Sequence, residues 1–113
     1  MSHHAAAIDD VLRSTALLSA AAPSTIERLA SASKWRTLQQ HDILFIVGSR
    51  ATNVFAVATG TLRVFTSGPG GTEPTLALLS SGDLVGELGV LDDVPRSTSV
   101  GALRRCDVVE VPA

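Results

Sequence analysis

The spacing of apolar side chains divides the chain into two parts that meet near Trp35. In the first part the apolar positions recur every three to four residues, which is typical of amphipathic helices. A first helix is predicted over residues 8 to 18, and a second is predicted to begin near Pro23 and to end before Trp35. Short helices of this kind need a larger body to pack on. The predicted inward-facing residues are Ile8, Val11, Leu12 and Leu18 in the first helix, and Ile26, Leu29 and Ala30 in the second.

The start of the second helix carries a capping pattern. Ser24 is followed three residues later by Glu27. A serine hydroxyl and a glutamate at this spacing can each accept from an unpaired N–H group of the first turn. The sequence therefore predicts a capping box with Ser24 as the N-cap residue.

After Trp35 the apolar residues are mostly β-branched or aromatic and come in runs of about five or six, separated by glycine, proline and serine. Ser67 to Gly71 is typical of an exposed hairpin tip. Many short strands without intervening helices favour a sandwich or barrel over a parallel α/β fold. The predicted strands are Trp35–Gln39, Ile43–Val47, Asn53–Ala58, Thr61–Thr66, Thr75–Ser80, Thr98–Ala102 and Asp107–Val111.

Composition and charge narrow the class of protein. The chain has 113 residues, enough for one domain with one core, and it is 45% hydrophobic, which argues against disorder. The net charge of −2 and the scattered basic residues argue against direct nucleic-acid contact. No apolar run is long enough to cross a membrane. The single cysteine, Cys106, fits a reducing cytoplasm and is interpreted as a small buried hydrophobe.

The segment from Gly86 to Ser97 has the make-up of an anion-binding cradle. A glycine permits a turn that a side chain would block, and the apolar run that follows it, Leu88 to Leu91, predicts a single helical turn. The free N–H groups of such a turn attract phosphate. Arg96 adds a permanent charge with planar donors, and Ser97 adds a hydroxyl. Glu87 is an acceptor that suits ligand hydroxyls, so the segment predicts a site for a sugar phosphate or a nucleotide.

These residues resemble a known pattern. Gly86-Glu87-Leu88-Gly89, a short loop, and then Pro95-Arg96-Ser97 is similar to the phosphate-binding cassette of cyclic nucleotide-binding domains. Those domains occur in bacterial transcription factors of the catabolite activator type, in regulatory subunits of cyclic-nucleotide-dependent kinases and in gated channels. The resemblance extends over about residues 12 to 111 and includes Gly60-Thr61-Leu62-Arg63-Val64 and Gly82-Asp83.

The resemblance implies a mainly β fold, an antiparallel eight-stranded β-roll with short N-terminal helices and a short helix in the cassette. It implies a helical segment at residues 1–34 and a roll at residues 35–113. The implied ligand is a cyclic purine nucleotide, with cAMP favoured over cGMP, and no cofactor is expected beyond it. The residues expected at the ligand are Gly86, Glu87, Leu88, Gly89, Arg96, Ser97 and Thr98 around the sugar phosphate, and Val64, Leu76 and Val85 against the base.

Within this implied site, Arg96 would neutralise the phosphodiester and Glu87 would accept from the ribose 2′-hydroxyl. Thr98 departs from the pattern, because the family has alanine there, and it adds a methyl and a hydroxyl beside the ligand.

The C-terminus leaves the output of the protein open. The family usually continues with helices that close over the base and form dimers, and these are expected to be absent because the chain stops at Ala113. The leading interpretation is a ligand-sensing regulatory module, with a homodimer or a fused output domain as candidate assemblies. The alternatives are the sensor half of a transcription regulator, the regulatory domain of an enzyme or channel, and a ligand-free interaction domain. Catalysis is not expected, and neither is a metal site, because His3, His4 and His41 form no metal-binding pattern.

Overall fold

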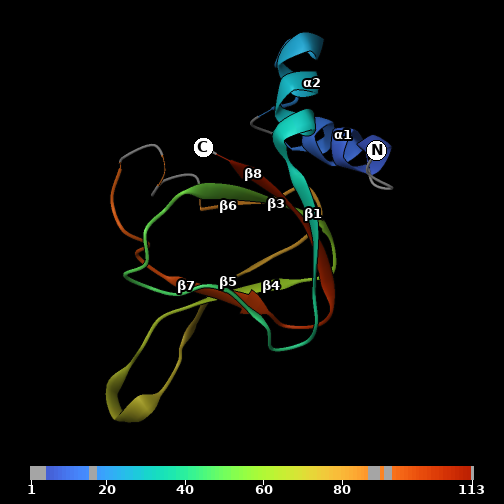
Figure 1. Cartoon of the computed structure of the whole chain (residues 1–113). Coiled ribbons are helices and arrows are strands. Elements are labelled where there is room, and N and C mark those ends of the chain that lie inside the picture. The colour runs from blue at the N-terminus through green and yellow to red at the C-terminus, as the bar shows by residue number, and fades with distance from the viewer. Residues whose placement is uncertain (1–4, 16–17, 87–89, 91–92, 113) are drawn as a thin grey trace.

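A computed structural model of the chain describes residues 5–15, 18–86, 90 and 93–112. It contains two helices, α1 (Ala5–Ser14) and α2 (Pro23–Ala32), followed by a body of strands. Figure 1 shows the helices together on one side of a roll made of two sheets. The two expected helices are therefore present, and they lie against the β-structure as their amphipathic pattern predicts.

Eight strands form two antiparallel four-stranded sheets, which confirms the predicted fold class. One sheet has the order β1-β8-β3-β6 and the other has the order β2-β7-β4-β5. Neighbouring strands such as β3 and β8 are far apart in sequence, so the roll is held by long-range pairing. The strands are β1 (Lys34–Leu38), β2 (Ile43–Phe45), β3 (Asn53–Thr59), β4 (Leu62–Phe65), β5 (Thr75–Leu79), β6 (Leu84–Val85), β7 (Ser99–Ala102) and β8 (Cys106–Pro112).

Two layers of apolar side chains stabilise this arrangement. The first fills the space between the sheets and includes Leu62 and Val108. The second lies between the helices and the β1-β8-β3-β6 sheet and includes Leu12, Ile26 and Val109. Because successive strand residues point to opposite faces, β8 contributes to both layers.

The strand predictions agree with the structure to within two residues at each end, with one omission. Strand β6 was not predicted, because two residues are too few to show an alternating pattern. The hairpin tip between β4 and β5 lies where it was expected, with a short 3-10 turn at Pro69–Gly71 and exposed side chains. Figure 1 shows this hairpin projecting from the body of the roll.

The predicted first helix was wrong in its bounds. Helix α1 ends at Ser14, where the Ser14 hydroxyl donates to the main-chain oxygen of Val11 at 2.7 Å. The Thr15 hydroxyl donates to the oxygen of Leu12 at 2.9 Å. Hydroxyls that bond back to the preceding turn compete with the helical hydrogen bonds. Leu18 therefore lies beyond the helix, although it still packs against the helix-side core.

The predicted capping box was also wrong. The N-cap residue of α2 is Ala22, with extended backbone angles and no side-chain capping bond, and Pro23 occupies the first turn. Proline suits this position because its missing N–H would have no partner there. Ser24 is consequently inside the helix rather than at its cap.

Two further observations concern Cys106 and membrane crossing. The Cys106 thiol is free and buried in the core between the sheets, as expected for a small hydrophobe. Among the residues that the structure describes, no helix has the length and apolar character needed to span a bilayer.

Candidate functional site

The side chain of Arg96 lies inside the roll. Only 5% of Arg96 is exposed, which is unusual for an arginine. One guanidinium nitrogen, Nη1, donates to the main-chain oxygen of Gly86 at 2.6 Å, and Nη2 donates to the main-chain oxygen of Asn53. These carbonyl groups orient the guanidinium but carry no net charge. A permanent positive charge is thus fixed in the interior, at the position where the sequence predicts an anion-binding group.

An aromatic ring supports this guanidinium. Its central carbon lies 4.1 Å from the centroid of the Phe45 ring, which in turn packs near Phe55 with 6.0 Å between ring centroids. A guanidinium over an aromatic face is stabilised by the negative face of the ring. The ring therefore restricts the guanidinium to one plane.

The backbone around Arg96 is held by the loop that follows β2. The Arg96 N–H donates to the oxygen of Ser49 at 2.8 Å, and the Gly48 N–H donates to the oxygen of Arg96 at 2.7 Å. Nearby, the Val47 N–H donates to the hydroxyl of the buried Ser99 at 2.9 Å. Gly48 has a φ of 87°, which glycine adopts without strain. These bonds fix the point at which the chain re-enters the roll.

Gly86 is required by two features of the same site. Its φ is 88°, and a Cβ placed on it would lie 2.4 Å from Nη1 of Arg96. Any larger residue would displace the guanidinium as well as strain the backbone. The turn at Gly82 and Asp83 sets up this position, because Asp83 accepts from the Ser80 N–H at 2.8 Å just before β6 begins.

The expected phosphate-side residues are only partly described. Glu87, Leu88 and Gly89 lie outside the described residues, as does most of the expected cassette helix. Ser97 is exposed and Thr98 is half-buried, and both directly follow Arg96.

The residues expected at the base occupy different environments. Val85 is buried in the core between the sheets, and Val64 packs against that core. Leu76 is 56% exposed and belongs to β5 at the edge of its sheet. The structure thus brings Val64 and Val85 into the interior that holds Arg96, whereas Leu76 lies nearer the solvent.

Sequence reasoning missed three residues of this site. Phe45 supports the guanidinium, Asn53 accepts from it through its main chain, and Ser99 fixes the adjacent loop. The hydrogen-bond partners of Arg96 include Asn53, which is 43 residues away in the sequence, and the still more distant Gly48 and Ser49, so their proximity depends on strand order. Of the three, only Ser99 carried a signal in the sequence, because it is a serine in an otherwise apolar strand.

The site has the chemistry of an anion receptor. It combines a buried cation, main-chain groups that orient it and apolar residues on the neighbouring strands. Within the described ranges, no group of three histidine, cysteine or acidic side chains is arranged to hold a metal ion.

Comparison with known proteins gives a consistent result. The family model for the cyclic nucleotide-binding domain matches residues 35–113. The cyclic AMP receptor protein of Thermus thermophilus is 32% identical over 98 residues, which cover 87% of this chain and 45% of the relative. The cAMP-dependent protein kinase regulatory subunit of Debaryomyces hansenii is 30% identical over 95 residues, which cover 84% of this chain and 20% of the relative.

A solved structure agrees with the fold. The regulatory domain of Toxoplasma gondii PKA, crystallised with cAMP, superposes with a TM-score of 0.87 at 22% identity. The match covers 96% of this chain and 42% of that one. This chain therefore spans less than half the length of each of these three proteins.

Proposed function

Because this chain belongs to the cyclic nucleotide-binding domain family, we propose that it is a regulatory module that senses a cyclic purine nucleotide, with cAMP as its ligand. The observation that carries the proposal is the fixed, buried guanidinium of Arg96 at the cassette position. A cyclic phosphodiester carries one negative charge, and an arginine supplies planar donors for two of its oxygens. The choice of cAMP is supported by the relatives, which are named as a cyclic AMP receptor and a cAMP-dependent kinase subunit.

The proposed site assigns a role to each group of residues. Arg96, Ser97 and Thr98 bind the phosphate together with the backbone of Gly86, Leu88 and Gly89, and Glu87 accepts from the ribose 2′-hydroxyl. Val64 and Val85 line the interior near the sugar and base, and Leu76 contacts the base from the edge strand. Residues 35–113 form the binding domain, and residues 1–34 form a helical segment on it. The module binds and does not catalyse, and its output resides in a further segment or partner.

Titration calorimetry with cAMP and cGMP tests the proposal on the wild-type chain and on Arg96→Ala. We expect binding to the wild type and a loss of about 2–4 kcal/mol in the variant, some 30- to 1000-fold, because a charged hydrogen-bonding group is removed. Arg96→Lys should recover little of it, since lysine lacks the planar fork.

The matched control is Arg28→Ala, which removes the same charge from an exposed position on α2. It should leave the affinity unchanged. Circular dichroism confirms that each variant is folded. A wild-type chain that binds neither nucleotide would favour the alternative of a ligand-free interaction domain, and equal affinity in Arg96→Ala would overturn the assigned site.

A further inference from the structure

The two sheets of the roll differ in what covers their outer faces. Helices α1 and α2 pack on the β1-β8-β3-β6 sheet through the second layer of apolar side chains, which includes Leu12, Ile26 and Val109. Figure 1 shows both helices on the side of the roll away from the β2-β7-β4-β5 sheet. The outer face of that second sheet is therefore left without the helical cover that the first sheet has in the described part of the chain.

The strand register places four residues in one row across this bare face. Ile43 pairs with Gly101, Gly101 pairs with Arg63, and Arg63 pairs with Leu78. Directly paired residues of antiparallel strands point to the same side of a sheet. Ile43 is 48% exposed and Leu78 is 57% exposed. These two apolar side chains lie at the two ends of the row, with Gly101 and Arg63 between them.

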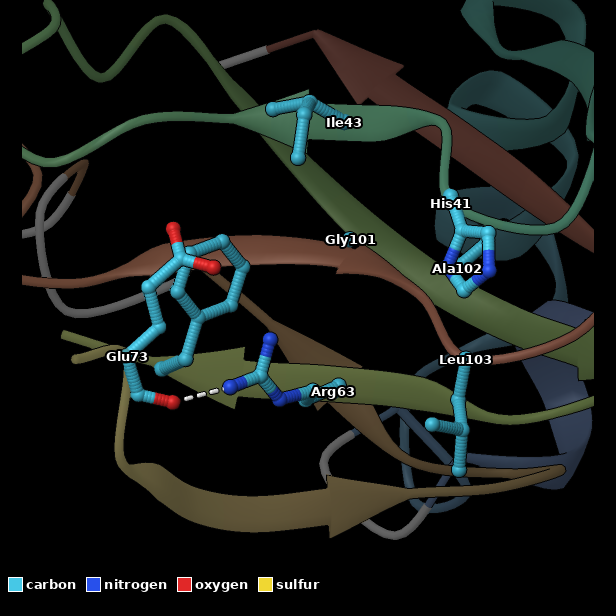
Figure 2. Close-up of a pocket in the computed structure, with 8 residues that line it drawn as sticks. His41, Ile43, Arg63, Glu73, Gly101, Ala102 and Leu103 are labelled. Carbon is cyan, nitrogen blue, oxygen red and sulfur yellow. Dashed lines mark hydrogen bonds between the residues drawn. The ribbon is translucent and has the colours of Figure 1, made fainter. Parts of the chain in front are cut away.

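A hollow of about 340 Å³ opens on the same face. Figure 2 shows Ile43 at the top of this hollow and Arg63 at the bottom, with Gly101 between them. Glu73 lies at the left and Leu103 at the lower right. A Cβ on Gly101 would lie 3.1 Å from the main-chain oxygen of Asp42 and 3.2 Å from Cδ1 of Ile43. The glycine thus lets β2 approach closely and keeps the hollow open.

Arg63 and Glu73 give this hollow one charge of each sign. The Arg63 guanidinium lies 4.5 Å from the centroid of the Phe65 ring, and its Nε donates to the Thr75 hydroxyl at 2.7 Å. A third contact, from Nη2, goes to the main-chain oxygen of Glu73, not to its carboxylate (Figure 2). No ion pair among the described residues involves either charge. The Arg63 guanidinium is therefore held in place, the Glu73 carboxylate is exposed, and neither charge is neutralised by an ion pair within the described ranges.

We propose that this outer face docks against the same face of a second copy of the chain. In a twofold dimer each surface meets itself in the opposite direction, so Arg63 faces Glu73 of the partner subunit, and Glu73 faces Arg63 of the partner subunit. Ile43, Leu78 and Leu103 supply the apolar area around the two charge pairs. A face that carries both signs in one hollow is complementary to itself, whereas a face of one sign would select a different partner.

Analytical ultracentrifugation of the full chain, from micromolar to millimolar protein, tests this. We expect a reversible dimer of twice the 11.7 kDa monomer mass. Leu78→Lys should weaken dimerisation by about tenfold or more, because it places a charge in the apolar contact. The control is Ala32→Lys, since Ala32 is exposed on α2, which packs on the other sheet, and it should leave dimerisation unchanged.

A charge exchange tests the twofold arrangement itself. Arg63→Glu and Glu73→Arg should each be monomeric alone, because like charges then meet across the interface. Mixed in equal amounts they should form a heterodimer, in which each charge pair is opposite again. Circular dichroism and the thermal midpoint of each variant show that it is folded.

Three results would overturn the proposal. One is a wild-type chain that stays monomeric at every protein concentration, which would mean that a second copy does not bind this face. Another is a dimer that Leu78→Lys does not weaken. The last is a mixture of the two folded charge variants that remains monomeric.

Discussion

The guanidinium of Arg96 occupies the space that a side chain at position 86 would need. It donates to the oxygen of Gly86, and its Nη1 lies 2.4 Å from where a Cβ would be. The glycine therefore serves the turn and the placement of the cation at once. At the scale of single residues, the site depends on this pair more than on any one side chain.

Gly86→Ala tests this dependence. We expect a loss of stability beyond the ~1–2 kcal/mol that a left-handed backbone costs an ordinary residue, because the guanidinium must also move. Affinity for cAMP should fall with it. Gly70→Ala is the control, since Gly70 also has a positive φ but nothing lies within 4 Å of its Cβ position. Urea unfolding and calorimetry of both variants measure the two effects, and equal losses would contradict the contact argument.

The Cys106 thiol makes the free energy of unfolding depend on pH in the alkaline range. Burial raises the pKa of the Cys106 thiol, and the carboxylates of Asp107 and Asp42 raise it further. Above the unfolded value of about 8.5, the unfolded chain loses its thiol proton while the native chain keeps it. The free energy of unfolding is therefore at its full value below that pH and falls as the pH rises towards the native pKa.

Urea unfolding at about pH 7.5 and about pH 9.5 measures this loss. The sequence has no tyrosine and one lysine, so few other groups titrate in this interval. Cys106→Ala should show a smaller decline between the two pH values than the wild type. Identical declines in both proteins would show that the thiol is not the source.

At the scale of elements, helix α2 begins without a good cap. Ala22 has the extended backbone of an N-cap residue, with φ −61° and ψ 145°, but its side chain cannot accept a hydrogen bond from the first turn. Ala22→Ser should therefore stabilise the protein by about 1 kcal/mol. Chemical unfolding followed by circular dichroism gives the value.

The control at this element is Ser24→Ala. Since Ser24 is inside the helix, its loss should change stability by no more than about 0.5 kcal/mol. If Ser24→Ala lowered the stability by as much as the loss of an N-cap side chain does, the capping box predicted from Ser24 and Glu27 would be present after all.

The elements could be predicted where local pattern determines them. Seven strands and two helices follow from the periodicity of apolar residues and from the breakers between them. Strand β6 could not be predicted from the local pattern, because its two residues are held as a strand only by their pairing with β3. The residues of the anion-binding cradle could be predicted, because Gly86 and Arg96 are residue types that suit a phosphate site and they occur in the same short segment. Its aromatic support from Phe45 could not, because that contact exists only after β2 and β7 have paired.

At the scale of the whole molecule, strand β8 joins the two apolar layers. Val108 points into the space between the sheets, and Val109 points towards the helices. Strand β3 has the same double role, with Val57 inward and Ala56 towards the helices. The helices and the roll therefore share strands, and neither layer can be lost without exposing the backs of β3 and β8.

We therefore expect the molecule to unfold in one transition. Leu12→Ala, in the helix-side layer, and Leu62→Ala, between the sheets, should each cost about 2–5 kcal/mol, because both residues are fully buried. Urea unfolding followed by Trp35 fluorescence and by far-ultraviolet circular dichroism should give one midpoint per protein, and both variants should lower it. Trp35 packs in the helix-side layer, so its fluorescence reports that layer. Val94→Ala, at an exposed position, should leave the midpoint in place. If Leu62→Ala lowered the dichroism midpoint but not the fluorescence midpoint, the layers would be independent, and the shared strands would not couple them.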